Sequence, residues 1–187
     1  MQSYQDFLVE ILIDEQTLQK RIAELGTEIS RDYKDSDGNL VLVCILRGGV
    51  VFMVELMQHI TIRHQVDFMA VSSYGTGARQ TSGSVRLSLD LQTDIRGKDV
   101  LLVEDIVDSG NTIAYVLEFL QTRQPRSLKI CALLDKEERR ETSVPIDYCG
   151  FKIANKFVFG YGLDLDEYYR NLPFVAVVDV NKYRPPA

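Results

Sequence analysis

The sequence predicts an α/β protein with a mainly parallel central sheet that is flanked by helices. Unbroken apolar runs rich in β-branched residues, the pattern of strands buried on both faces, recur along the chain. Segments with helical periodicity lie between several of these runs, and this alternation builds a parallel sheet with helices on both faces. Ligands of such sheets bind beyond the carboxyl ends of the strands, so we expect the functional residues there.

The first part of the chain contains two helix patterns and two strand patterns. After Asp14, a candidate N-cap, apolar residues recur every three or four positions from Leu18 to Tyr33, as in an amphipathic helix. The turn residues 35–38 end this pattern, and the run 40–46 is apolar throughout. We expect a helix over 14–33, a strand over 40–46, a helix over 50–60 and a strand over 66–73.

The remainder of the chain continues the alternation after one irregular segment. Residues 75–84 are small, polar and Gly-rich without periodicity, which predicts a long mobile loop. Residues 85–91 alternate as a half-exposed strand does. We expect further strands over 100–103, 128–134 and 175–180, and a helix over 112–122 that turns Val116, Leu117 and Leu120 inward.

The composition is that of a globular chain with an acidic balance. The 187 residues include 21 Lys and Arg against 27 Asp and Glu, for a net charge of −6, and 45% are apolar. We expect one domain over 1–187, because no linker or repeat divides the chain and its size supports one core. The acidic balance argues against coating nucleic acid or anionic lipid, but a local site for a phosphorylated ligand remains compatible with it.

The sequence favours a cytoplasmic protein. The first residues lack the basic-then-apolar order of a signal peptide, and Arg47 interrupts the longest apolar stretch, 40–57, before it could span a bilayer. Cys44, Cys131 and Cys149 are far apart and form no C-x-x-C pair, as is usual in a reducing compartment. We therefore expect no membrane association.

The segment V-L-L-V-E-D-I-V-D-S-G-N-T, residues 100–112, is the strongest functional pattern. A buried strand runs into two adjacent acids, and a polar turn then opens a helix. Hydroxyls and free amides at a helix N-terminus bind anions, while the acids can accept hydrogen bonds from sugar hydroxyls or hold a divalent cation. Asp108, at the edge of the turn, is placed to accept a proton. The candidates are Glu104, Asp105, Asp108, Ser109, Gly110, Asn111 and Thr112.

A simpler interpretation of the same turn is that Asp-Ser-Gly only caps a helix, with the acids solvated. Taken alone, Asp-Ser-Gly favours this interpretation. The fixed order of acids, turn and helix favours a binding site. The segment is neither a Walker A loop nor a dinucleotide-binding G-x-G-x-x-G turn.

Residues 100–112 resemble the phosphoribosyl-pyrophosphate binding motif of the type I phosphoribosyltransferases. The resemblance implies a single-domain fold of that type, with a small hood and a flexible lid loop. It also implies that the turn binds the 5-phosphate and that the two acids engage the ribose hydroxyls. The segment Arg47-Gly48-Gly49 resembles the pyrophosphate loop of purine phosphoribosyltransferases, in which a non-proline cis peptide is common.

Three further segments resemble the lid and the base-binding parts of this family. Ser73-Tyr74 and the Gly-rich stretch after it resemble the lid, and L-L-D-K, ending at Lys136, resembles the strand end that contacts the exocyclic oxygen of a 6-oxopurine. Residues 156–172, K-F-V-F-G-Y-G-L-D-L-D-E-Y-Y-R-N-L, resemble the C-terminal segment of hypoxanthine and hypoxanthine-guanine phosphoribosyltransferases. This implies that four residues act near the base and the metal: Phe157 by stacking, Val158 through its main chain, Asp164 beside the metal, and Arg170 as a further site residue.

Each of these residues also has an ordinary structural interpretation. Phe157 fits a core position, Lys136 precedes a charged run and fits a solvated face, and Asp164 fits a turn. Tyr74 fits a strand end. Their shared order along the chain, together with the anion-binding turn, favours the functional interpretation.

The resemblance implies transfer of the 5-phosphoribosyl group from phosphoribosyl pyrophosphate to hypoxanthine, and to guanine, in purine salvage. It implies Mg²⁺ near Glu104, Asp105 and Asp164, small-molecule substrates, no nucleic-acid partner, and a homodimer or homotetramer. Two alternatives remain: a transferase of another purine, and a ligand-sensing regulator that keeps the fold but binds nucleic acid. A regulator would need a basic face or an added domain.

Overall fold

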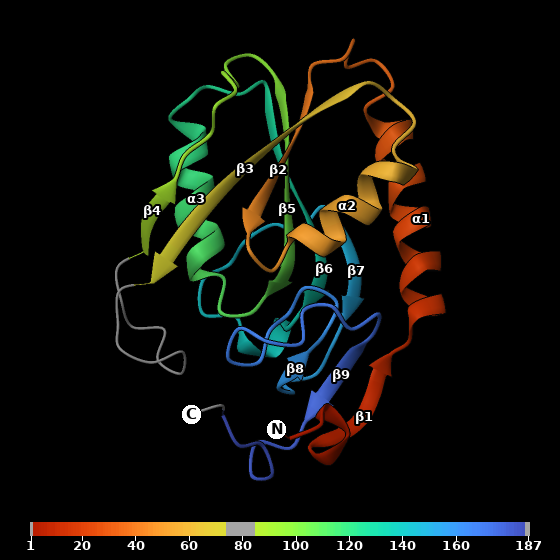
Figure 1. Ribbon diagram of the computed structural model, residues 1–187. Helices are drawn as coiled ribbons and strands as arrows, with labels where there is room; N and C mark the ends of the chain where they lie inside the picture. The colour runs from red at the N-terminus through yellow and green to blue at the C-terminus, as the bar shows by residue number, and fades with distance from the viewer. Residues whose placement is uncertain (1, 74–84, 186–187) are drawn as a thin grey trace.

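The computed structural model describes residues 2–73 and 85–185, which form two sheets and three α-helices (Figure 1). The larger sheet has six strands in the order β4-β3-β2-β5-β6-β7, and the smaller one has three in the order β1-β9-β8. The strands are β1 (Leu8–Ile13), β2 (Leu40–Leu46), β3 (His64–Ser73), β4 (Val85–Leu89), β5 (Asp99–Val107), β6 (Ser127–Asp135), β7 (Tyr148–Lys152), β8 (Val158–Phe159) and β9 (Val175–Val178). The helices are α1 (Glu15–Asp32), α2 (Val50–His59) and α3 (Asn111–Gln121).

The five strands from β3 to β7 in the larger sheet are parallel, and only β4 runs antiparallel at the edge. From β2 the chain continues to β3 and β4, which lie on one side of β2 in the sheet. The later strands β5, β6 and β7 lie on its other side. The order therefore reverses between the neighbours β2 and β5. In open α/β sheets, the crevice at such a reversal is where ligands bind.

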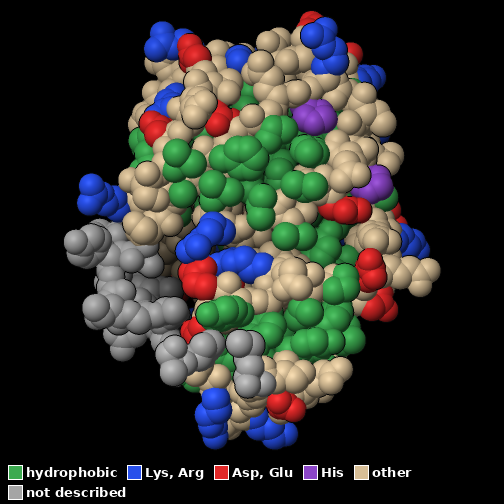
Figure 2. Space-filling view, in the orientation of Figure 1, with side chains coloured by type: hydrophobic (Ala, Val, Ile, Leu, Met, Phe, Trp, Pro, Cys, Tyr) green, Lys and Arg blue, Asp and Glu red, His purple; other side chains and the backbone are tan. Residues whose placement is uncertain are grey.

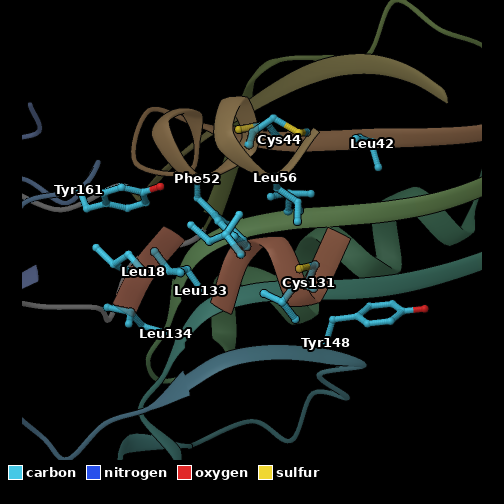
Figure 3. Close-up of a cluster of buried hydrophobic side chains, with 14 of the residues drawn as sticks. Leu18, Leu42, Cys44, Phe52, Leu56, Cys131, Leu133, Leu134, Tyr148 and Tyr161 are labelled. Carbon is cyan, nitrogen blue, oxygen red and sulfur yellow. The ribbon is translucent and has the colours of Figure 1, made fainter. Parts of the chain in front are cut away.

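Helices cover both faces of the larger sheet (Figure 1): α1 and α2 lie on one face and α3 on the other. Asp14 caps α1 by accepting a hydrogen bond from the Thr17 amide at 2.8 Å, as predicted. Leu18 of α1 and Phe52 of α2 pack with residues of β2 and β6 in the cluster drawn in Figure 3. This packing fixes the strands, and with them the loops at their carboxyl ends.

The smaller sheet lies below the carboxyl ends of the parallel strands in Figure 1, and both chain termini lie beside it. Its strands are antiparallel, and its own core is aromatic, with Phe7 and Phe159 fully buried. The sheet places the loop between β8 and β9 next to the larger sheet's carboxyl edge. Gly162 of this loop lies so close to Gly48 that a Cβ on it would be 2.2 Å from the Gly48 oxygen.

The structure corrects several predicted elements. The strand predicted over 100–103 is β5, which continues to Val107, so the two acids lie within the strand. The strand predicted over 175–180 ends at Val178 and belongs to the smaller sheet. Sequence reasoning missed β1, β7 and β8, which are short or irregular in their polar–apolar pattern. The loop predicted over 75–84 lies outside the described residues.

Among the residues that the structure describes, no helix is both long and apolar enough to cross a bilayer.

Candidate active site

Three chain segments meet at the carboxyl edge of the larger sheet. They are the turn after β2, the end of β5 with the turn into α3, and the end of β6. Parallel neighbours bring their carboxyl ends together, so residues far apart in sequence become neighbours here. Asp105 lies directly against the turn after β2, because a Cβ on Gly48 would lie 1.7 Å from its Oδ2. Only glycine fits at this position.

Glu104 and Asp105 are buried carboxyl groups, each with 9% of its surface exposed. Asp105 Oδ1 accepts a hydrogen bond from the Ile106 amide at 2.9 Å, whereas Glu104 Oε2 has no hydrogen-bond partner among the described residues. Burial raises the pKa of Asp105 to about 6, and burial together with the neighbouring Asp105 raises the pKa of Glu104 well above its usual range. Glu104 Oε2 therefore lacks the donor or counter-charge that a buried carboxylate oxygen normally has among the described residues, and Asp105 has only a main-chain donor at Oδ1.

A divalent cation fits these two carboxylates, because an unpartnered buried carboxyl oxygen gains a counter-charge when a cation binds. Mg²⁺ in particular is commonly held by one or two carboxylates together with substrate oxygens. Within the described part of the chain, no three acidic, His or Cys side chains form a group that would hold a metal alone. Asp164 is engaged elsewhere, since its Oδ1 lies 2.9 Å from Arg170 and its Oδ2 accepts the Glu167 amide.

The turn from β5 into α3 leaves the helix N-terminus open. The N-cap is Gly110, with φ of 87°, and no side chain caps the helix. Ser109 Oγ only accepts a long bond of 3.4 Å from the Asn111 amide. Asp-Ser-Gly therefore supplies the N-cap residue but no side-chain cap, and the two acids are buried rather than solvated as the simpler interpretation has them. Gly110 to Thr112 present the amide groups of a helix N-terminus, an arrangement that suits anions.

A segment that the sequence analysis did not single out supports this turn. The Glu141 and Thr142 amides both donate to the Ser109 oxygen, at 2.9 and 3.0 Å. The Asn111 side chain is held by the same two residues, with its Nδ2 2.8 Å from Glu141 and its Oδ1 2.5 Å from Thr142. Asn111 therefore braces the turn through its side chain. No short-range pattern in the sequence links positions 111 and 142.

Asp108 and Lys136 directly follow the neighbouring strands β5 and β6, and their side chains come together. Lys136 Nζ lies 3.4 Å from Asp108 Oδ2, and Arg139 Nε lies 3.1 Å from Asp108 Oδ1. Lys136 is buried, so the interpretation that it belongs to a solvated charged face is wrong. Arg139 belongs to the charged run that follows Lys136, and its contact with Asp108 was not predicted.

The segment before β8 presents an exposed aromatic ring. Phe157 has 49% of its surface exposed, so it is not the core residue that its apolar neighbours favoured. The next residue, Val158, is buried in β8 and pairs with Val177 of β9. Pairing in the small sheet fixes this segment and leaves the Phe157 ring available to a ligand.

Arg47 follows a cis peptide bond, Leu46–Arg47, and its side chain is 70% exposed. Its Nη2 donates to Glu167 Oε1 at 2.9 Å, and Arg170 Nη2 donates to Glu167 Oε2 at 3.1 Å. Arg170 also donates to the Gly162 oxygen at 2.8 Å. The two arginines therefore converge on one carboxylate, a contact that sequence reasoning did not find.

The two remaining predicted residues are Ser73, in β3, and Tyr74. Ser73 is the last residue of that strand, and its backbone pairs with Val85 of β4. Tyr74 lies outside the described residues, so the predicted lid stays a prediction.

An open, mainly parallel sheet with an anion-binding turn at its reversal point defines a class of α/β proteins that bind phosphorylated ligands. Within this class the chain belongs to one family: the model described as "Phosphoribosyl transferase domain" matches residues 9–166.

Curated relatives and solved structures agree with this family. The hypoxanthine phosphoribosyltransferase of Escherichia coli K12 is 51% identical over 170 residues, which cover 91% of this chain and 95% of the relative. The hypoxanthine-guanine phosphoribosyltransferase of Mycobacterium avium is 47% identical over 178 residues, which cover 93% of this chain and 87% of the relative. The crystal structure of a hypoxanthine phosphoribosyltransferase from Staphylococcus aureus aligns with a TM-score of 0.90 at 40% identity, covering 97% of each chain.

Proposed function

We propose that the protein transfers the 5-phosphoribosyl group of phosphoribosyl pyrophosphate to hypoxanthine, and to guanine, with release of pyrophosphate. The observation that carries this proposal is the meeting of two different anion sites at one sheet edge. The open N-terminus of α3 suits a phosphate monoester, and the Arg47 turn beside Asp105 suits a second anion. The names of the E. coli and M. avium relatives support the choice of base.

The 5-phosphate would bind the amides of Gly110 to Thr112, and Glu104 and Asp105 would accept hydrogen bonds from the ribose hydroxyls. Arg47, with the main chain of Gly48 and Gly49, would bind the pyrophosphate that leaves. As it leaves, the ribose acquires positive charge, which the oxygens of Glu104 and Asp105 would stabilise when these groups are ionised. The ribose would thus be held between two fixed anion sites.

The purine would lie on the exposed Phe157 ring, with the Val158 main chain along its edge. Lys136 would donate to the 6-oxo group, which discriminates against adenine, where an amino group stands. Asp108 would accept or steady a proton on the imidazole ring of the purine and so raise the nucleophilicity of the attacking nitrogen. The 3.4 Å contact between Lys136 and Asp108 supports a common location for both roles.

The metal is proposed to be Mg²⁺, held by Glu104 and Asp105 together with substrate oxygens, with Asp164 nearby through its contact with Arg170. When bound, it would supply Lewis-acid neutralisation of the pyrophosphate charge. We place Asp164 as a positioning residue, because Arg170 and the Glu167 amide already occupy its oxygens.

The remaining proposals concern the state of the protein. We propose one domain over 1–187, which the family match over 9–166 supports. Three free cysteines support a cytoplasmic location. We also propose a homodimer or homotetramer, because apolar side chains including Val54 and Val66 are exposed over α2 and β3 (Figure 2). Sedimentation velocity of the wild type tests the last point.

The test of substrate choice is product formation from phosphoribosyl pyrophosphate, Mg²⁺ and one radiolabelled base at a time. We expect nucleotide from hypoxanthine and guanine and little from adenine. Product from adenine or xanthine alone would favour the transferase of another purine. No product from any base, with retention of nucleic acid in a filter assay, would favour the ligand-sensing regulator.

A further inference from the structure

Glu167 lies between Arg170 and Arg47, and the proposed function assigns Arg47 to pyrophosphate. Its two carboxylate oxygens accept separate hydrogen bonds, one from Arg47 at 2.9 Å and the other from Arg170 at 3.1 Å. Carboxylate and phosphate oxygens are both anionic acceptors for guanidinium N–H groups, so Glu167 takes up donors that phosphate oxygens could otherwise use. The arginines therefore hold an internal anion before any external anion arrives.

The positive φ of Glu167 suggests a functional reason for a glutamate at this position. Leu165 and Tyr168 exchange backbone hydrogen bonds of 3.1 and 3.2 Å around a two-residue turn formed by Asp166 and Glu167. Both turn residues have positive φ, 50° and 72°. Glycine suits such a position best, and a long side chain there is strained. Residues that break a local backbone preference are expected at functional sites.

Glu167 is also connected by hydrogen bonds to other residues of the proposed site. Its amide donates to Asp164 Oδ2 at 2.9 Å, and Asp164 Oδ1 contacts Arg170. Arg170 in turn is fixed to the loop through the Gly162 oxygen, and this loop lies against Gly48. The turn thus directs the Glu167 carboxylate at Arg47, which precedes Gly48.

We propose that Glu167 is an internal competitor for the pyrophosphate group, which must displace it from Arg47 and Arg170 in order to bind. The proposal rests on the proposed function of Arg47. After transfer, the carboxylate returns to the arginines and favours release of the product pyrophosphate. Glu167 therefore sets the affinity of the site for phosphoribosyl pyrophosphate and pyrophosphate.

The expected effect is moderate, because Glu167 and Arg47 are 57% and 70% exposed and solvent weakens such pairs. Loss of the two pairs, with loss of one repelling negative charge, predicts about 3- to 10-fold tighter binding of pyrophosphate in Glu167→Gln. The KM for phosphoribosyl pyrophosphate should fall by a similar factor, while the KM for hypoxanthine stays unchanged.

Isothermal titration calorimetry with inorganic pyrophosphate in Mg²⁺ buffer measures this affinity without turnover. The variants are Glu167→Gln and Glu167→Gly, the second of which also relieves the positive-φ strain and should melt at the wild-type temperature or above. The matched control is Glu24→Gln. Glu24 forms an i,i+3 pair with Arg21 at the same 3.1 Å, on α1 and away from the site. It should bind pyrophosphate as the wild type does.

Tighter binding in both Glu167 variants but not in Glu24→Gln supports the proposal. Unchanged binding overturns it, and weaker binding overturns it by making Glu167 a support for the arginines. If the wild type forms nucleotide and the Glu167 variants bind pyrophosphate as tightly as the wild type does, only this inference is contradicted. A wild type that neither binds pyrophosphate nor forms nucleotide contradicts the proposed function and this inference together.

Discussion

Asp108 is the residue whose surroundings best fit a role in proton transfer. Its carboxylate is within reach of two cations, the buried Lys136 and the exposed Arg139, and its side chain is still 41% exposed toward the crevice. The cations orient the carboxylate, and the exposed part can meet a ligand. Geometry of this kind comes first in identifying a general base.

Replacing Asp108 by Asn tests this role. The amide keeps the shape but cannot accept the proton, so we expect kcat to fall by about 10²- to 10⁴-fold, with a small change in either KM. Steady-state kinetics with hypoxanthine and phosphoribosyl pyrophosphate measure kcat and the two KM values. An unchanged kcat would remove Asp108 from the proposed chemistry.

Lys136 should determine the choice between 6-oxo and 6-amino purines. Lys136→Ala removes the donor to the 6-oxo group, and the loss of a charged hydrogen bond of about 1.5–3 kcal/mol predicts at least a 10-fold smaller preference for hypoxanthine over adenine. Competition between the two labelled bases gives this ratio directly. If the variant discriminates as the wild type does, another group reads the 6-position.

At the scale of elements, the turn into α3 depends on one glycine. A Cβ at Gly110 would lie 2.3 Å from the Thr142 oxygen, and its φ of 87° already disfavours other residues. We expect Gly110→Ala to lower the free energy of unfolding by about 2–4 kcal/mol, since strain and contact both act. The KM for phosphoribosyl pyrophosphate should rise, because the displaced turn carries the proposed phosphate site.

Gly97 provides the control for this substitution. It has a similar φ of 70°, but a Cβ there would meet nothing within 4 Å. Gly97→Ala should therefore lose only the backbone preference, about 1 kcal/mol in urea unfolding, and keep its KM. Equal losses in both variants would mean that the Thr142 contact does not matter.

Asp99, at the end of β5 away from the proposed site, should make the stability depend on pH without affecting activity. Hydrogen bonds from Arg126 Nε at 2.9 Å and Ser127 Oγ at 2.7 Å lower the pKa of Asp99 from its ordinary 3.8. A carboxyl group with a lowered pKa in the folded state stabilises the protein above 3.8, and this contribution disappears as the pH falls through the folded value.

Asp99→Asn should therefore unfold more easily than the wild type at pH 7, by about 1–3 kcal/mol. The difference should shrink steadily below pH 3.8. Urea unfolding at pH 7 and at decreasing acid pH gives the comparison, and kcat should stay unchanged because Asp99 lies far from the site. If the free energies of unfolding of the wild type and Asp99→Asn differ by the same amount at pH 7 and at acid pH, the ionised Asp99 carboxylate is not the source of the stabilisation.

The elements that the sequence predicted correctly are those with a strong local pattern. The run 40–46 is β2 with the same bounds, and the spacing of Leu18 to Ile29 marks the buried face of α1. The short strands β1 and β8 have no such pattern, because each is held by pairing with β9, which for β1 lies near the other end of the chain. Long-range pairing of this kind leaves no local trace.

At the scale of the whole molecule, the topology assembles a site from residues spread over more than a hundred positions. A motif or a resemblance singled out individual residues such as Asp105 and Lys136, and the structure places both at the carboxyl edge of the larger sheet. It could not predict how they contact one another. Arg139 on Asp108 and Glu167 on Arg47 depend on neighbouring strands and on the placement of the small sheet.

The net charge of −6 also acquires a specific meaning at this scale. Several acids lie at the carboxyl edge of the larger sheet, where two of them are buried with raised pKa values. The proposed phosphate sites use backbone amides and arginines instead. An acidic chain can therefore bind a polyphosphate through a local site, although it disfavours extended polyanions.

The stoichiometry of the reaction tests the central claim most directly. Phosphoribosyl pyrophosphate, Mg²⁺ and labelled hypoxanthine are incubated with the protein, and nucleotide and pyrophosphate are quantified in the same samples. We predict one pyrophosphate released for each inosine monophosphate formed, and almost none released without the base. Pyrophosphate release without nucleotide, or no release at all, would contradict the account.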